Sequence, residues 1–137
     1  MIPDRIIEQG TLRTDGTRAA VEVRIPWYRA LPASCISEFA LAVDGVQAPA
    51  ESLRWTMNGT TYRTDELAAH PEDWWFPLDS AVVSGDVPVA DDGSEHRVDV
   101  DLKLYIPYIV IGDGEVLRIE EHDAKTMPAA TAKEAVA

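Results

Sequence analysis

The segment Arg97-Val98-Asp99-Val100-Asp101-Leu102-Lys103-Leu104-Tyr105-Ile106 alternates without interruption between apolar and mostly polar side chains. Successive side chains of a β-strand point to opposite faces, so a period of two predicts a strand with one buried and one solvated face. The buried face would consist of Val98, Val100, Leu102, Leu104 and Ile106. A strand of this kind is typical of an antiparallel sheet, which can keep one face in water.

The same period of two recurs in shorter segments along the chain. It is present in residues 21–25, 39–43 and 53–57, and further strands are expected near 6–12, around Tyr62 and near 81–87. Asp44-Gly45 and Asn58-Gly59 are dipeptides that supply the two positive φ angles of a tight hairpin turn. No long stripe with a helical period of 3.6 is present. The sequence therefore predicts an all-β fold, an antiparallel two-layer β-sandwich.

One short helical turn and one domain boundary are also predicted. Thr64 can cap a turn over residues 65–69, which begins with two acidic residues and is stopped by Pro71. After His122 the apolar residues no longer follow the period of the sheet. We therefore expect a single domain over residues 1–122 and a C-terminal tail over 123–137 that is flexible or docked onto a partner.

Composition limits the class of protein. The chain has 137 residues, 46% of them hydrophobic and 26% charged, which is typical of one soluble globular domain. Twelve Lys and Arg against 24 Asp and Glu give a net charge of −12, which argues against nucleic acid and anionic membranes as partners. No apolar run approaches the ~20 residues of a membrane span. The single cysteine, Cys35, fits a reducing compartment, so we expect a cytoplasmic protein.

The residues that catalysis or metal binding usually requires do not cluster in the sequence. His70, His96 and His122 are 26 residues apart in polar, loop-like contexts, and no H-x-H, H-E-x-x-H or C-x-x-C pairing occurs. There is no G-x-S-x-G nucleophile elbow and no glycine-rich phosphate loop. We therefore expect no catalytic residue and no metal ligand in this chain, although its many carboxylates leave a glycosidase-like pair open.

Two prolines interrupt strand patterns and are followed by aromatic residues, in Ile25-Pro26-Trp27-Tyr28 and in Ile106-Pro107-Tyr108. Proline cannot donate to a β-ladder, so each marks an edge, a bulge or a strand end. Tyr105 lies on the polar face of its strand, and Arg29 follows the first aromatic pair. Trp, Tyr and Arg dominate the centres of interfaces, so these residues predict either a partner interface or two corners of the core. The expected interface residues are Trp27, Tyr28, Arg29, Tyr105 and Tyr108.

The densest aromatic cluster of the chain is Trp74-Trp75-Phe76. Trp74 and Trp75 can form a substrate-side platform on which a sugar stacks, or they can anchor the core or an interface. On its residues alone, the chain is a binding or structural β-sandwich without an active site of its own.

Four segments resemble the small (β) subunit of bacterial C-glycoside deglycosidases. The most specific is the R-I-P-aromatic-Y-R-x-L-P pattern within residues 23–32, and the others are 42–46, 55–67 and 74–76. Their order and spacing are also similar to those of the family, and together they cover about residues 5–115.

This resemblance implies a β-sandwich that works only in a complex with a larger α subunit. In the family, the α subunit is a TIM-barrel protein that carries a divalent metal, typically manganese. The complex cleaves the carbon–carbon bond of 3-oxo-C-glucosides, including those of flavonoids, to a free aglycone and an unsaturated keto-sugar. The resemblance thus implies an accessory subunit of a carbon–carbon lyase, without a cofactor of its own and inactive in isolation. The alternative is a stand-alone carbohydrate-binding module.

Overall fold

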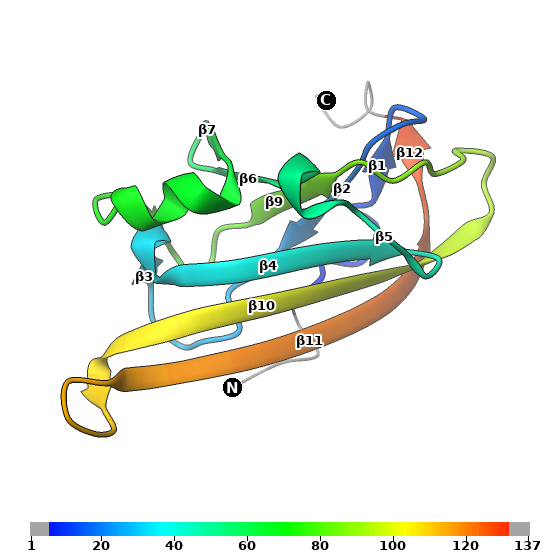
Figure 1. The fold of residues 1–137 in the computed structure, drawn as a ribbon. Helices are drawn as coiled ribbons and strands as arrows, with labels where there is room; N and C mark the ends of the chain where they lie inside the picture. Colours follow the sequence, from blue (N-terminus) through cyan, green and yellow to red (C-terminus); the bar gives the residue numbers. More distant parts are fainter. Residues whose placement is uncertain (1–5, 132–137) are drawn as a thin grey trace.

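The computed structural model describes residues 6–131, and these residues form two main β-sheets that pack face to face (Figure 1). The strands are β1 (Arg13–Thr14), β2 (Ala19–Val23), β3 (Leu31–Pro32), β4 (Ile36–Val43), β5 (Val46–Gln47), β6 (Arg54–Met57), β7 (Thr60–Tyr62), β8 (Trp74–Trp75), β9 (Ala81–Gly85), β10 (Glu95–Val110), β11 (Val116–Pro128) and β12 (Ala130–Thr131). Three short 3-10 helices connect them: η2 (Ala33–Cys35), η3 (Ala50–Ser52) and η4 (Thr64–Ala69).

The strand order confirms the predicted all-β, two-layer sandwich. A six-stranded sheet has the order β12-β1-β2-β9-β6-β7, a four-stranded sheet has the order β11-β10-β4-β5, and β3 pairs with β8. The paired strands are antiparallel, except for the parallel pair of β1 and β12. The rings of Phe39 in β4 and Trp55 in β6 meet edge to face at 5.3 Å and so join the two sheets through the core.

The predicted central strand, residues 97–106, lies within β10. Its apolar residues are buried and its polar residues face outward, as the period of two requires. β4 pairs with β10 only between Val98 and Leu104, whereas β11 follows β10 to the end of the hairpin. Residues 105–118 therefore extend beyond the sandwich as a two-stranded ribbon, which we call the β arm (lower left in Figure 1).

The two hairpin dipeptides have the predicted conformation. Asp44, Gly45, Asn58 and Gly59 all have positive φ angles, of 53°, 80°, 53° and 82°. Each dipeptide therefore forms the tight turn of a hairpin, β4–β5 and β6–β7 respectively.

The predicted helical turn is η4, but the residue predicted to cap it is wrong. The cap is Arg63, whose backbone N–H donates to the Glu66 carboxylate at 2.7 Å. Thr64 lies inside the helix, and its buried hydroxyl has no hydrogen-bond partner among the described residues. Because the Glu66 carboxylate already accepts from the backbone N–H at the start of the helix, the Thr64 hydroxyl is not required as a cap. No helix within residues 6–131 is long and apolar enough to cross a membrane.

The structure corrects the boundary that we predicted at residue 122. β11 crosses this boundary and continues to Pro128, Met127 is fully buried, and β12 pairs with β1. In β11 only every fourth side chain is buried, and one of these is Asp123, whose carboxylate accepts the backbone N–H of Ile7 at 2.9 Å. Because the buried Asp123 is polar, the apolar residues of this segment do not show the period of two. The sequence alone therefore predicts a tail here and not a strand. Residues 132–137 of the predicted tail lie outside the described residues.

The strand expected near residues 6–12 is also shorter than predicted. Before β1, a single isolated β-bridge joins Ile7 of this segment to Val23. Regular strand pairing begins only at β1. The segment is nevertheless part of the core, because Ile6, Ile7 and Leu12 are buried.

Candidate partner-binding surface

Four of the five residues predicted to form an interface lie together. The Trp27 indole N–H donates to the Tyr108 hydroxyl at 2.5 Å, and the rings of Trp27 and Tyr28 lie 5.0 Å apart. The Arg29 guanidinium lies 5.7 Å from the centre of the Tyr28 ring and 5.3 Å from that of Tyr108. The hydrogen bond that the Tyr28 hydroxyl donates to Tyr108 raises the pKa of Tyr28. We call Trp27, Tyr28, Arg29 and Tyr108 the arginine–tyrosine cluster.

The two prolines position this cluster. Regular pairing of β10 with β11 stops at Ile106 and resumes at Val110, so residues 107–109 form an irregularity that begins with Pro107. On the other side of the cluster, β2 ends at Val23, three residues before Pro26. The predicted interruptions of the ladder are therefore confirmed, and they release Tyr108 and Trp27 from regular strands.

Tyr105 lies on the β arm but in a different contact. It pairs with Arg118 across β10 and β11, and the Arg118 guanidinium lies 5.1 Å from the centre of its ring. Tyr105 is partly buried and packs against the core. Arg118 and Tyr105 thus form a second arginine–tyrosine contact, which lies within the arm and is separate from the arginine–tyrosine cluster.

The structure separates the two tryptophans that we predicted to face a substrate. Trp75 is fully buried, packs edge to face on Trp55 at 4.9 Å, and donates its indole N–H to the Asp79 carbonyl at 3.1 Å. The substrate-side role predicted for Trp75 is therefore wrong, because its ring has no free face. Trp74 is 43% exposed, because neighbouring residues of a strand point to opposite sides.

Hydrogen bonds fix the segment that carries Trp74. The Asp73 carboxylate accepts from the Asn58 amide and from the Tyr62 hydroxyl, both at 2.7 Å, and the second bond raises the pKa of Tyr62 to about 12. The Asn58 amide also donates to the Trp74 carbonyl at 2.8 Å. The β6–β7 hairpin therefore holds the exposed Trp74 in a defined position.

Three segments carry most of the exposed apolar surface, and they meet at one end of the molecule. The hydrogen bond from Trp27 joins the loop after β2 to Tyr108 of the β arm. This loop leads into β3, which pairs with Trp74 and Trp75 of β8. Of the eight large hydrophobic residues exposed in the described chain, seven belong to these three segments (residues 28, 74–78 and 108–111) and only Val46 does not. We call the seven the aromatic end: Tyr28, Trp74, Phe76, Leu78, Tyr108, Val110 and Ile111.

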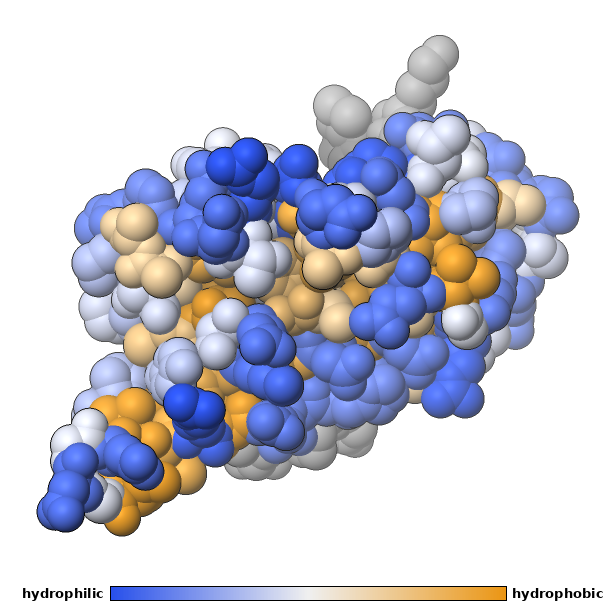
Figure 2. Space-filling model, viewed as in Figure 1, coloured by the Kyte–Doolittle hydropathy of each residue, from blue (hydrophilic) through white to orange (hydrophobic). Residues whose placement is uncertain are grey.

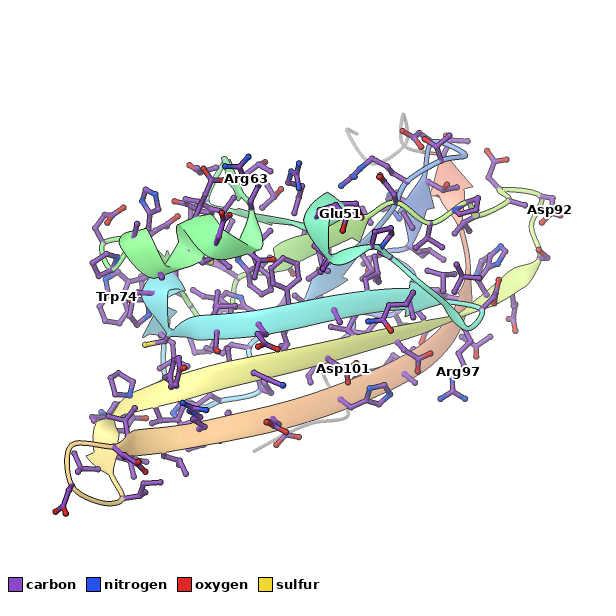
Figure 3. The ribbon with its side chains drawn as sticks, viewed as in Figure 1. Glu51, Arg63, Trp74, Asp92, Arg97 and Asp101 are labelled. Carbon is purple, nitrogen blue, oxygen red and sulfur yellow. The ribbon has the colours of Figure 1, made fainter. Side chains whose placement is uncertain are left out.

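The figures place the aromatic end. Figure 2 shows apolar surface at the tip of the β arm, and Figure 3 labels Trp74 at the same end of the molecule. Leu78, Val110 and Ile111 were missed as site residues by sequence reasoning. The available signal was the apolar run 109–111 directly before the turn residues Gly112 to Gly114. Several large apolar side chains exposed near one another on an acidic protein are typical of a site that binds another protein.

The histidines occupy ion pairs. His96 and His122 lie in strands β10 and β11, so the loop contexts predicted for them are wrong. His96 Nδ1 lies 2.6 Å from the Asp44 carboxylate, and His122 Nδ1 lies 2.6 Å from that of Asp101; both hydrogen bonds raise the histidine pKa. Within residues 6–131, no three His, Cys, Asp or Glu side chains are grouped as metal ligands would be.

Two other features of the described chain offer little chemistry. Cys35 is buried, and this burial raises the pKa of its thiol, which disfavours the nucleophilic thiolate. An open groove of about 440 Å³ crosses β4, β10 and β11, but both of its basic side chains are already paired: Lys103 with Glu38 at 3.2 Å, and His122 with Asp101. The aromatic end is therefore the best candidate site.

Comparisons with known proteins agree with this picture. Residues 6–108 match the family model described as C-glycoside deglycosidase beta subunit. A C-glycoside deglycosidase beta subunit of Microbacterium trichothecenolyticum is 64% identical over 132 residues, covering 96% of this chain and 100% of that protein. One from Arthrobacter globiformis is 66% identical over 130 residues, covering 95% and 98%.

A more distant relative extends the comparison. The 3'-dehydrocarminate deglycosidase beta subunit of a Microbacterium species is 38% identical over 127 residues, covering 93% of this chain and 95% of that protein. The family match over residues 6–108 includes Trp27, Trp74 and Tyr108. The chain belongs to the C-glycoside deglycosidase beta-subunit family.

Proposed function

We propose that this chain is the accessory, non-catalytic subunit of a C-glycoside deglycosidase complex and that its aromatic end binds the larger, catalytic α subunit. The observation that carries the proposal is that seven of the eight exposed large hydrophobic residues of the described chain belong to three segments joined by the Trp27–Tyr108 hydrogen bond and the pairing of β3 with β8. Exposed aromatic residues held in place by hydrogen bonds lose little side-chain entropy on binding, which favours their use in an interface.

The proposed reaction is cleavage of the carbon–carbon bond between the sugar and the aglycone of a 3-oxo-C-glucoside. The C3 ketone acidifies the C2 proton, so a base of the α subunit can remove it. A double bond then forms between C1 and C2, the bond from C1 to the aglycone breaks, and its electron pair is protonated on the aglycone carbon. The products are the free aglycone and an unsaturated keto-sugar. A relative named for 3'-dehydrocarminate supports an oxidised C-glycoside as the substrate class.

The catalytic groups are expected in the partner. We propose that the α subunit is a TIM barrel and holds a divalent metal, manganese, which would supply Lewis-acid stabilisation of the enolate. We further propose that the complex acts in the cytoplasm on C-glycosides such as those of flavonoids. The free, buried Cys35 is compatible with a reducing compartment.

The alternative of a stand-alone carbohydrate-binding module is less favoured. A sugar-stacking platform needs exposed ring faces, and of Trp74 and Trp75 only Trp74 has one. The neighbouring exposed residues Phe76 and Leu78 add apolar surface without the polar groups that orient a sugar.

The proposal is tested by assaying the chain alone, the α subunit alone and their mixture for aglycone release from a 3-oxo-C-glucoside. We expect size-exclusion chromatography to show a complex, and we expect activity only in the mixture. Metal, measured by elemental analysis after dialysis against a chelator, should follow the α subunit. Aglycone release by the isolated chain at the rate of the mixture would overturn the proposal, as would glycan binding by the isolated chain without assembly.

A further inference from the structure

Two arginines differ from the other basic residues of the described chain in their partners. Arg29 and Arg118 contact tyrosine rings and donate to no carboxylate and no backbone carbonyl within residues 6–131. The other basic residues of this part form an ion pair with a carboxylate or donate to a backbone carbonyl: Arg13, Arg18, Arg24, Arg54, Arg63, Arg97, Lys103 and Lys125. In a chain with twice as many acidic as basic residues, an arginine with neither a carboxylate nor a carbonyl acceptor is unexpected.

Both arginines lie at the aromatic end. Arg29 stacks on Tyr28 and Tyr108 of the arginine–tyrosine cluster, and Arg118 stacks on Tyr105 of the β arm. Both side chains are exposed. The two arginines whose guanidinium groups have neither a carboxylate nor a carbonyl acceptor within residues 6–131 therefore lie beside exposed apolar surface.

Stacking leaves the hydrogen-bonding capacity of an arginine free. A tyrosine ring contacts the face of the guanidinium, whereas the five N–H donors point outward in the plane of the group. This plane matches the two oxygens of a carboxylate. The ring also restricts the side chain before binding, which reduces the entropy lost when a partner is bound.

We propose that Arg29 and Arg118 each bind a carboxylate of the α subunit, so that two charge pairs set within apolar contacts join an acidic chain to its partner. This inference rests on the proposed function, because it names the chemistry of the surface that binds the α subunit. The partner surface should combine an apolar area for the aromatic end with two acidic side chains. The pairs also explain how a chain of net charge −12 associates through attraction rather than repulsion.

The test measures the affinity of the purified α subunit for Arg29→Gln, Arg118→Gln and a matched control, Arg97→Gln, at several salt concentrations. Arg97 is exposed, pairs with Asp99 at 3.2 Å and lies far from Trp74 in Figure 3, so its substitution removes the same charge away from the aromatic end. We expect Arg29→Gln and Arg118→Gln each to weaken binding about tenfold or more at low salt. Binding of both variants should also depend less on salt than binding of the wild type.

Two further measurements make the result decisive. Melting temperatures of the isolated variants establish that each one folds, and Arg29→Lys, which keeps the charge but loses the planar fork, should bind with intermediate affinity. If both glutamine variants bind like Arg97→Gln, or if only one of them is weakened, the two-arginine proposal is overturned. If the wild-type chain does not bind the α subunit at all, the proposed function itself fails, which is a different outcome.

Discussion

The indole N–H of Trp27 donates a hydrogen bond to the hydroxyl of Tyr108, 81 residues further along the chain. This bond joins the loop after β2 to the irregular part of β10. Trp27 is also partly buried and packs against the core, whereas Tyr108 is 45% exposed. Trp27 therefore fits the interpretation as a corner of the core, whereas Tyr108 keeps enough exposed surface for the predicted interface.

Trp27→Ala should lower the free energy of unfolding of the isolated chain by about 1–3 kcal/mol, less than for a fully buried Trp, because the side chain is only partly buried. Tyr108→Phe keeps the ring and should change stability by less than about 1 kcal/mol. Denaturant unfolding of both variants checks these values. An unchanged stability of Trp27→Ala would show that its contact with the core contributes nothing.

Phe76→Ser should weaken assembly with the α subunit without destabilising the free chain. Phe76 is 49% exposed at the aromatic end, and Val46, which is 51% exposed in β5, provides a matched control elsewhere on the surface. Each serine variant should alter the free energy of unfolding by less than about 0.5–1 kcal/mol. Titration calorimetry with the α subunit should show weaker binding for Phe76→Ser alone. Equal binding by the two variants would remove Phe76 from the interface.

The pair of His96 and Asp44 should make stability depend on pH. The Asp44 carboxylate raises the pKa of His96 above 6.5, so the stability that the charged His96 contributes is complete below about pH 6.5 and is lost as the pH rises through its folded pKa. The pKa of Asp44 is lowered from 3.8, chiefly by His96, so its contribution is lost only as the pH falls through that lower value.

Thermal melts between pH 4 and 9 check this expectation. The melting temperature of the wild type should fall as the pH rises above about 6.5, and His96→Gln should flatten this part of the profile and cost about 1 kcal/mol or more in acid. His122→Gln is the control, because the pKa of His122 is raised in the same direction but its side chain is 50% exposed. A larger effect of His122→Gln than of His96→Gln would contradict this prediction, because it would show that the pH dependence comes mainly from His122.

Met127→Ala should destabilise the chain by about 2–4 kcal/mol, because it opens a cavity where a fully buried side chain packs. The neighbouring Thr126 is exposed, so Thr126→Ala should have little effect. A chain that ends at His122 loses the second half of β11 and the Asp123 acceptor for Ile7, and we expect it not to fold cooperatively. Circular dichroism melts distinguish these outcomes from those of a dispensable tail, for which all three variants would melt alike.

The sequence by itself determined those features that depend on neighbouring residues. The alternation in residues 97–106 specified the central strand, and the two Asx-Gly dipeptides specified their hairpins, because strand faces and positive φ angles are local properties of the chain. The motif around Pro26 likewise indicated the family without any knowledge of the fold, and the comparisons confirmed it.

Only the tertiary structure decided which distant residues meet and which faces are covered. Trp74 and Trp75 are equivalent in sequence, but pairing of β8 with β3 turns one outward and buries the other. Asp123 interrupts the apolar pattern of β11, yet it is buried because the Ile7 N–H and the Lys125 ammonium satisfy its carboxylate. Such contacts bridge more than 80 residues in the cases of Trp27 with Tyr108 and Ile7 with Asp123, and no local pattern encodes them. The aromatic end is therefore a product of the fold, since it exists only where packing of the two sheets brings its three segments together.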